Sequence, residues 1–306
     1  MQLIRTIEEL SNCHRPSVVS IGNYDGVHLG HQHVIKTLLE KSRELSAPST
    51  VITFDPLAKE FFNPQSVIRL TTIEERAELL FELGVDQVLC IEFTADFAAN
   101  TAQQFVDNVL VNGLGAKYVC VGDDFRFGKG RVGDFAFLQN AGKQQGFEVT
   151  AHDTFRLNNE RVSSGRVRDA LTSDDFGLAE QLLGRPYCIN GVVSKGQQLG
   201  RTIDFPTANI VLPDIKLPVH GVYAVSTQTQ KFGKLNGVAN VGTRPTVDGA
   251  EQRLEVHLFD FDEELYGEFL QVQFHHKIRD ERKFESLESL KKQIIKDAKA
   301  AFDFFN

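Results

Sequence analysis

A glycine-rich turn between an apolar run and an amphipathic segment is the feature that most constrains this chain. Residues 18–21 form a short apolar run typical of a buried strand, and apolar residues recur at helical spacing over 34–39. The turn between them, Gly22-Asn23-Tyr24-Asp25-Gly26-Val27-His28-Leu29-Gly30-His31, has three glycines at intervals of four, which allow sharp bends and the close approach of a ligand. Because the following helix offers N–H groups and a partial positive charge at its N-terminus, the turn predicts a polyphosphate site.

Two other interpretations of this turn stay open. Glycine and aspartate are common in any turn, so the spacing alone is equally compatible with ordinary turn chemistry. The histidines His28, His31 and His33 cluster as zinc ligands do. However, no Cys, Asp or Glu at ligand spacing completes a tetrahedral set, and the HExxH pattern is absent. The pattern therefore favours phosphate over a metal.

The composition indicates an ordinary globular protein of two domains. The chain has 306 residues, of which 42% are hydrophobic and 24% charged, and this length exceeds what one core usually needs. A formal charge of −8 without any long Lys/Arg run argues against a nucleic-acid partner or an anionic membrane surface. No run is long enough to span a bilayer and the four cysteines are widely spaced, so we expect a cytoplasmic protein with reduced thiols and no membrane partner.

The rest of the first half alternates strands with helices. Apolar runs predict strands at 50–54, 87–91 and 118–121, and helical spacing predicts helices at 74–83 and 102–110. This alternation is typical of a doubly wound parallel sheet. Ligands of such sheets lie at the carboxyl ends of the strands, so we expect Phe54, Asp55 and Pro56 beside the glycine-rich turn.

Two further segments of the first half are suited to a nucleotide. Residues 122–130, Gly-Asp-Asp-Phe-Arg-Phe-Gly-Lys-Gly, nearly match a P-loop, but one residue too many separates the glycines, and Gly130 stands where Ser or Thr must hold magnesium. We interpret them as a second ligand loop, glycine-rich for close approach and aromatic for stacking on a flat ring. In the other segment, Ser163 and Ser164 precede a helix and are flanked by three arginines. The two serines fit two interpretations, ordinary N-caps or a phosphate clamp formed with the arginines.

The pattern of predicted elements changes near residue 185, from alternating strands and helices to strands alone, which predicts domains at 1–184 and 185–306. Short alternating strands without intervening helices are predicted at 189–193, 221–226, 235–241, 254–259 and 270–274, a series typical of an antiparallel barrel. From Ser286 onward, apolar residues recur on one helical stripe, so this last helix should pack on the barrel. Thr207 and Asn209, two apart on an extended segment, point the same way and could hold one hard cation, although the pair also fits an ordinary strand edge.

These segments together resemble one family. The first turn resembles the HxGH signature of the nucleotidyltransferase superfamily, in the form typical of bacterial bifunctional riboflavin kinase/FAD synthetases, with Tyr24 replacing the usual Phe. Residues 122–128, 163–168, 206–209, 237–246 and 255–257 resemble further motifs of that family and follow in its order. Agreement at all of these separated segments is not a chance result.

The resemblance implies a fold and two activities. The first half would be a Rossmann-like nucleotidyltransferase domain that adenylylates FMN to FAD and releases pyrophosphate. The second half would be a six-stranded antiparallel barrel with a terminal helix that phosphorylates riboflavin to FMN. The partners implied are riboflavin, FMN and ATP as small-molecule substrates, with ATP as co-substrate and Mg²⁺ as cofactor, and we expect a monomer or a weak homo-oligomer.

The resemblance also assigns candidate site residues. The expected catalytic residues are His28 and His31 in the first half and Glu255, as carboxylate base, in the second. Without the motif, Glu255 would read as an outward charge beside Val256. The expected ATP- and phosphate-binding residues are Gly22, Asn23, Gly30, Asp124, Arg161, Ser163, Ser164, Arg168, Gly196, Gly200 and Arg201. The expected flavin-binding residues are Phe54, Pro56, Phe62, Phe125 and Phe127, and the expected metal ligands are Thr207 and Asn209.

Three departures from the family pattern leave alternatives. Gly165 stands where the family has a Thr, Asp55 replaces a Glu, and Asp204 replaces a Gly. Gly165 removes one expected hydroxyl donor. The alternative that the first half binds flavin without catalysing a reaction therefore stays open. A nucleotidyltransferase for another phosphate acceptor is a further alternative, which the kinase-like second half disfavours.

Overall fold

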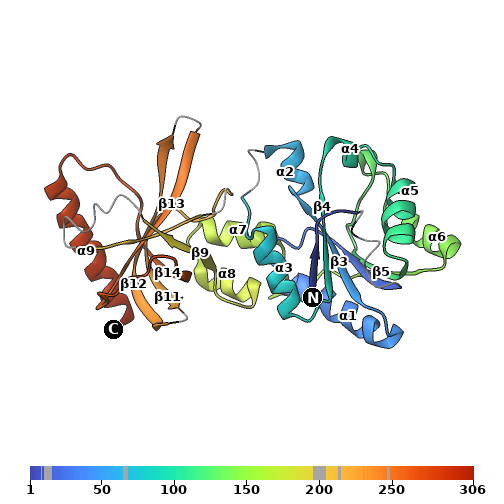
Figure 1. Cartoon of the computed structure of the whole chain (residues 1–306), viewed down its shortest axis with the longest axis horizontal. Helices are drawn as coiled ribbons and strands as arrows, with labels where there is room; N and C mark the ends of the chain where they lie inside the picture. The colour runs from blue at the N-terminus through green and yellow to red at the C-terminus, as the bar shows by residue number, and fades with distance from the viewer. Residues whose placement is uncertain are drawn as a thin grey trace. The chain divides into compact units, whose positions relative to one another are not determined.

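The chain forms two compact units, Met1–Ser164 and Gly165–Asn306, each with its own core (Figure 1). The computed structural model describes residues 1–7, 9, 16–64, 68–195, 205–212, 215–229, 231–246 and 249–306. Within these ranges, no helix combines the length and the apolar character needed to cross a membrane.

The first unit is built on a six-stranded parallel sheet. The strands lie in the order β1-β4-β3-β2-β5-β6. Its strands are β1 (Gln2–Ile4), β2 (Ser17–Ile21), β3 (Ser49–Asp55), β4 (Gln87–Glu92), β5 (Ala116–Gly122) and β6 (Glu148–His152), and β7 (Arg156–Leu157) and β8 (Glu160–Arg161) form a separate hairpin. Its helices are α1 (Leu29–Leu45), α2 (Ala58–Phe62), α3 (Ile73–Glu82), α4 (Ala95–Ala98), α5 (Ala102–Phe105) with the π-helical η3 (Val106–Gly113), the short η4 (Lys129–Arg131), and α6 (Phe135–Gln145). The predicted doubly wound parallel sheet is confirmed.

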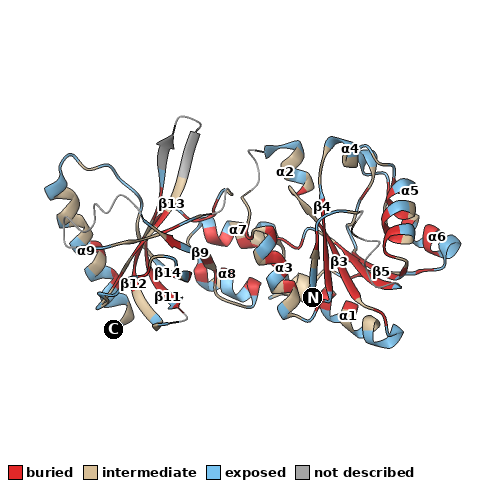
Figure 2. Ribbon diagram, viewed as in Figure 1, coloured by how far each residue is buried: buried red, intermediate tan, exposed pale blue. Residues whose placement is uncertain are grey.

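Both faces of the sheet are covered, which explains the continuous apolar runs in its strands. Every residue of β2 is buried (Figure 2). On one face, Val18 and Val51 pack against Ile35 and Leu38 of α1 and against α3. On the other face, a second core cluster joins the strands to α5, η3 and α6.

The structure extends the sequence prediction for this unit. The helix expected at 102–110 begins as α5 and continues as η3 to Gly113. Strand β1 and the pair α6 and β6 add to the elements that the sequence predicted. Strand β6 pairs with β5 and carries His152 to the same edge as Gly122.

The second unit contains a closed barrel of six antiparallel strands in the order β10-β13-β12-β11-β14-β9. Its elements are α7 (Ser164–Thr172), whose first residue belongs to the first unit, α8 (Phe176–Leu183), β9 (Cys188–Ser194), β10 (Ala208–Ile210), β11 (Gly221–Thr229), β12 (Gly233–Thr246), β13 (Gly249–Leu258), β14 (Phe269–Arg279) and α9 (Leu287–Phe305). The predicted six-stranded barrel and its terminal helix are confirmed.

Helix α8 packs with the barrel rather than forming a free linker. The ring of Phe176 lies edge-on to Tyr223 and stacks at 6.1 Å on Phe274. Just before α8, the Asp174 carboxylate accepts hydrogen bonds from the Tyr223 hydroxyl at 3.0 Å and from Lys277 Nζ at 2.8 Å. The compact unit therefore starts before α8, while the functional boundary at 184 stays a prediction.

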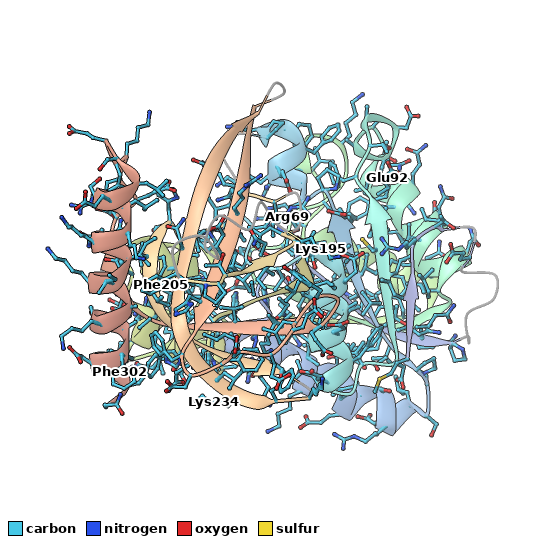
Figure 3. The ribbon with its side chains drawn as sticks, turned by 60° about the vertical axis from the view of Figure 1, so that its left-hand side comes forward. Arg69, Glu92, Lys195, Phe205, Lys234 and Phe302 are labelled. Carbon is cyan, nitrogen blue, oxygen red and sulfur yellow. The ribbon has the colours of Figure 1, made fainter. Side chains whose placement is uncertain are left out.

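A buried ion pair contributes to the attachment of helix α9 to the barrel. The Asp297 side chain is 5% exposed, and both of its oxygens accept hydrogen bonds from Arg279, from Nε at 3.0 Å and from Nη2 at 2.7 Å. Gln293 donates a further bond to the same carboxylate at 2.7 Å. Ala301 of the same helix adds apolar contact with Val222 and Ala224 of the barrel, whereas Phe302 (labelled in Figure 3) is 46% exposed.

We predict that Asp297→Ala lowers the free energy of unfolding of the second unit by about 3 kcal/mol, because it leaves a largely buried guanidinium without its partner. Urea titration followed by circular dichroism measures this loss. The matched control is Asp303→Ala, which removes an exposed pair with Lys299 on the same helix and should cost less than about 0.5 kcal/mol. Equal losses would show that the buried pair does not hold α9.

Candidate active sites

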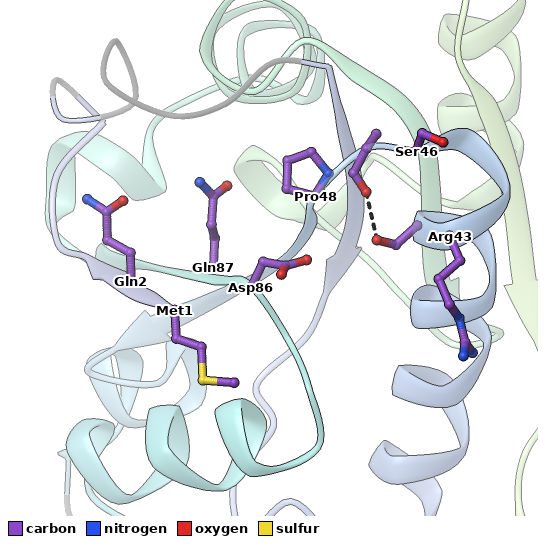
Figure 4. A pocket seen from close by; sticks show the side chains of 9 residues that line it. Met1, Gln2, Arg43, Ser46, Pro48, Asp86 and Gln87 are labelled. Atoms are coloured by element: carbon purple, nitrogen blue, oxygen red, sulfur yellow. Dashed lines mark hydrogen bonds between the residues drawn. The ribbon is translucent and has the colours of Figure 1, made fainter.

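The first unit has a hollow at each end of its sheet. The one at the amino ends, of about 540 Å³, is lined by Met1, Gln2, Ser42, Arg43, Ser46, Ala47, Pro48, Asp86 and Gln87 (Figure 4). The Asp86 carboxylate there accepts hydrogen bonds from the Ser49 amide at 2.8 Å and the Ser49 hydroxyl at 2.7 Å. Its charge therefore serves to join two strands, and we assign no chemistry to this hollow.

The hollow at the carboxyl ends of the strands is a cavity of about 960 Å³. The segments after β2, β3, β4, β5 and β6 form its walls. It brings together predicted residues from widely separated segments, namely Gly22, Asn23, His28, Gly30, His31, Phe54, Phe62, Asp124, Phe125, Phe127, Arg161, Ser163 and Ser164. Within the described part of the chain, Pro56 does not line the cavity and Arg168 belongs to the second unit.

The two histidines of the turn form one stacked pair. Their ring centroids lie 3.6 Å apart with the planes at 15°. His28, which is 5% exposed, caps α1 because its Nδ1 accepts the His31 amide at 3.3 Å. A neutral ring whose Nδ1 accepts carries its proton on Nε2.

Gly30 is required by close packing rather than by an unusual backbone. A Cβ at this position would lie 3.1 Å from the His28 ring and 3.4 Å from the carbonyl oxygen of Val162. A side chain at this position would require the His28 ring or the Val162 segment to shift by a few tenths of an ångström. The glycine thus keeps two of the predicted phosphate-binding segments in contact.

One wall of the cavity is made of phenylalanines. Phe125 stacks on Phe127 at 5.5 Å with the planes at 15°. Phe54 lies 5.8 Å from Phe93 and 5.9 Å from Phe97, which sequence reasoning did not propose. Phe93 directly follows β4, so the rule that places ligands at the carboxyl ends of strands could have found it.

Contacts of the predicted residues with one another and with the glycine-rich turn hold the polar rim. Arg161 Nη2 lies 2.7 Å from the Asp124 carboxylate, and both side chains are half exposed or more. The Ser164 hydroxyl donates to the carbonyl oxygen of Asp25 at 2.8 Å, so its proton is committed to the glycine-rich turn. Of these two donors, the exposed arginine is the more easily redirected to a ligand.

Several polar residues of the cavity escaped the sequence prediction. They are Lys59, Asn63, Asn100, Asp123, Arg126, Arg131, His152, Asp153 and Thr154. Burial lowers the pKa of His152, and the nearby His33 lowers it further, so its imidazole is neutral near pH 7. Apart from Asp123 and Arg126, which lie inside the motif at 122–128, these positions carry no sequence motif, and the tertiary fold brings them to the cavity.

The barrel brings the predicted metal ligands next to the predicted base. In the register of the barrel, Asn209 of β10 and Asn240 of β12 each lie directly opposite Glu255 of β13. Side chains opposite one another share a face and have Cβ atoms about 5 Å apart. Thr207 immediately precedes β10, and its carbonyl oxygen accepts a bond from Asn209 Nδ2 at 3.5 Å.

The strand alternation places Glu255 on the outer face of the barrel. Its neighbours Leu254 and Val256 are each 1% exposed and face the core, while Glu255 is half-buried. His257, on the same face, contacts the Pro206 carbonyl at 2.8 Å and so holds the segment before β10 against β13. The predicted phosphate residues Gly196, Gly200 and Arg201 lie outside the described residues.

The surroundings of Glu255 change its affinity for a proton. Burial is the main influence and raises the pKa of its carboxyl above the ordinary range, Arg253 lowers it, and Glu281 raises it. A carboxylate with a raised pKa is a stronger base than an exposed one. This environment suits the removal of a proton from an alcohol.

Comparison with known proteins identifies both units. Residues 10–166 match the FAD synthetases, and residues 183–305 match the riboflavin kinases. The bifunctional riboflavin kinase/FMN adenylyltransferase of Escherichia coli strain K12 is 48% identical over 100% of this chain and 98% of its own length. The protein of the same name from Haemophilus influenzae is 46% identical over 100% of both chains.

A solved structure extends the likeness to the fold. It is described as a macrolide-efflux protein from Streptococcus pneumoniae, is 32% identical, and superposes with a TM-score of 0.80 over 96% of this chain and 97% of its own. The two matched families occur in the order that the sequence motifs predicted, which confirms the resemblance. The chain belongs to the family of bifunctional riboflavin kinase/FMN adenylyltransferases.

Proposed function

We propose that the cavity of the first unit transfers the adenylyl group of ATP to FMN, and that the barrel face around Glu255 transfers a phosphoryl group from ATP to riboflavin. One observation carries the first assignment: a single cavity, in the unit that matches FAD synthetases, gathers the histidine pair, the aromatic wall and Arg161. The second rests on the register that sets Asn209 opposite Glu255 in the unit that matches riboflavin kinases.

Adenylyl transfer to FMN needs charge stabilisation more than a base. The FMN phosphate is already anionic at neutral pH and attacks the α-phosphate of ATP. Negative charge therefore gathers on the α-phosphate oxygens and on the pyrophosphate that leaves. The N–H of His28, the positive end of α1 and the guanidinium of Arg161 supply donors at the cavity. His31, stacked on His28, contributes a second imidazole.

Phosphorylation of riboflavin needs a base, because its acceptor is an alcohol. Glu255 lies on the barrel face, and burial raises the pKa of its carboxyl. We assign it the role of the base that removes the proton of the riboflavin hydroxyl. Thr207 and Asn209 offer hydroxyl and amide oxygens, which suit Mg²⁺, a cation that usually takes few protein ligands and several phosphate oxygens. When bound there, the ion would neutralise charge on the ATP phosphates.

The same reasoning extends to the setting of the enzyme. Cys90, Cys120 and Cys188 are free thiols, which supports the expected cytoplasmic location, and Cys13 lies outside the described residues. We assign riboflavin, FMN and ATP as the substrates of this chain, as the names of its relatives imply.

We predict that His31→Ala and His28→Asn each lower the rate of FAD formation from FMN by about 10² to 10³, as expected when one charge-stabilising donor is removed. Asn at position 28 keeps an N-cap acceptor for α1 and removes only the imidazole. The formation of FMN from riboflavin should stay near the wild-type rate. The control is His33→Ala, an exposed histidine of the same helix that does not line the cavity. Separate chromatographic assays with FMN and with riboflavin test this, and loss of both activities would contradict independent sites.

We predict the reverse separation for Glu255→Gln. An amide of the same shape cannot accept the hydroxyl proton, so riboflavin phosphorylation should fall by at least about 10², within the usual range for a positioned base. FAD formation from supplied FMN should be unchanged. Glu263→Gln, an exposed carboxylate of the β13–β14 connection, is the matched control and should keep both activities.

We predict that the kinase activity falls at low pH and that Glu255 is the group responsible for this acid limb of the pH profile. The base acts only when ionised, so kcat/KM for riboflavin should be full above its raised pKa and fall as the pH drops through it. Glu281→Gln removes a like charge and should move this limb to lower pH, whereas Arg253→Gln removes an opposite charge and should move it to higher pH. Shifts of both variants in one direction would assign the limb to another group.

A further inference from the structure

Two loops of the cavity are joined behind its wall by a buried polar chain. The Thr53 hydroxyl, on β3, donates to the carbonyl oxygen of Asn23 at 3.0 Å and accepts a bond from Arg76 Nη1 at 2.9 Å. The same guanidinium nitrogen lies 3.3 Å from the carbonyl oxygen of Phe54. The chain thus links the glycine-rich turn, which carries Asn23, to the start of the aromatic wall at Phe54.

The chain is fully buried and does not contact the cavity itself. Thr53 and Arg76 are each 0% exposed, and neither lines the cavity, whereas Asn23 and Phe54 both do. Arg76 comes from α3, whose N-terminus is fixed by the capping box of Thr72 and Glu75. The anchor is therefore a rigid helix rather than a loop.

The guanidinium is costly for the core, which indicates a role beyond packing. Within the described part of the structure, Arg76 Nε and Nη2 are buried without a hydrogen-bond partner. Burial of a charged group with unsatisfied donors costs stability that an apolar side chain of the same size would not lose. Burial lowers the pKa of Arg76, and the charge of Asp25, which opposes this most, sits on a carboxylate that already accepts hydrogen bonds from Leu70 and Thr71.

We propose that Thr53 and Arg76 form a positioning relay that keeps Asn23 and Phe54 at the spacing required when both substrates of adenylyl transfer are bound. The proposal rests on the assignment of that reaction to the cavity. Both atoms that the relay holds are main-chain carbonyls, so it sets the course of the two loops rather than the orientation of a single side chain. Small misplacements of about 1 Å between reacting groups can cost about 10² in rate.

Strand β3 supplies a matched control. Thr50 is also 0% exposed, and its hydroxyl donates to Gln87 Oε1 at 3.0 Å, at the amino end of the same strand. Thr50→Val and Thr53→Val each replace one buried hydroxyl by a methyl group of the same shape. If the hydroxyls served stability alone, the two variants would behave alike in the folded enzyme.

The test measures kcat and KM for FAD formation from FMN and ATP in the full chain, at a temperature where thermal melts show every variant folded. Thr53→Val should lower kcat by at least about tenfold, while Thr50→Val should keep it. Riboflavin phosphorylation, measured on the same samples, should stay unchanged in both. Equal kcat values for the two variants would overturn the relay.

Variants of Arg76 separate its hydrogen bonds from its charge. Arg76→Met should lower kcat as Thr53→Val does, and the double variant should be no worse than the poorer single variant within about twofold, because both break one unit. Arg76→Lys keeps the charge but lacks the guanidinium fork, so we expect an intermediate loss. Loss in Arg76→Met with normal activity in Thr53→Val and Arg76→Lys would assign the effect to charge and overturn the relay.

Absence of FAD formation in the wild-type and Thr50→Val proteins alike would overturn the proposed reaction, and the relay with it.

Discussion

The buried carboxylate of Asp25 is the interaction on which the first unit's cavity depends. It is 1% exposed and accepts hydrogen bonds from the amides of Leu70 and Thr71 and from the Thr71 hydroxyl, at 3.1 to 3.2 Å. Loops at the ends of parallel strands have no ladder to hold them, so their course must be set by such contacts. The Ser164 hydroxyl donates to the carbonyl oxygen of Asp25, which ties a third segment to the turn. Asp25 therefore organises a site that it does not enter.

The two units solve two different chemical problems with the means that each fold offers. A parallel sheet gathers loops and the N-terminus of α1 at one edge, where donors can surround an acceptor that is already anionic. A barrel offers a pleated face instead, on which a register such as Asn209 opposite Glu255 sets oxygen ligands beside a carboxylate. The half-buried carboxylate that we propose as a base thus lies in the unit assigned the alcohol acceptor, and the donor-rich cavity lies in the unit assigned the phosphate acceptor.

The sequence predicted what depends on local pattern and missed what depends on tertiary contact. The central strands β2 to β5 are continuous apolar runs because both sheet faces are covered, so periodicity revealed them, whereas β1 has three residues and offers too short a pattern. In the cavity, motif residues such as His28 and Phe125 were predicted by resemblance. His152 and Phe97 carry no motif, and Arg76 appears in sequence as an ordinary helical arginine. Its burial against Thr53, 23 residues earlier in the chain, is decided by how α3 crosses the sheet.

The replacement of Phe by Tyr at position 24 shows how the turn absorbs a departure from the family pattern. Ser20 donates its proton to the carbonyl oxygen of Cys120, so the 2.5 Å contact between Ser20 and Tyr24 requires the tyrosine hydroxyl to be the donor. Burial raises the pKa of that hydroxyl well above its ordinary range, which keeps the proton in place. The added oxygen is thus satisfied on the core side of the turn, while the ring packs against Gly22, where a Cβ would lie 3.0 Å away. The substitution extends the core's hydrogen bonding and leaves the polar groups of the cavity to its ligands.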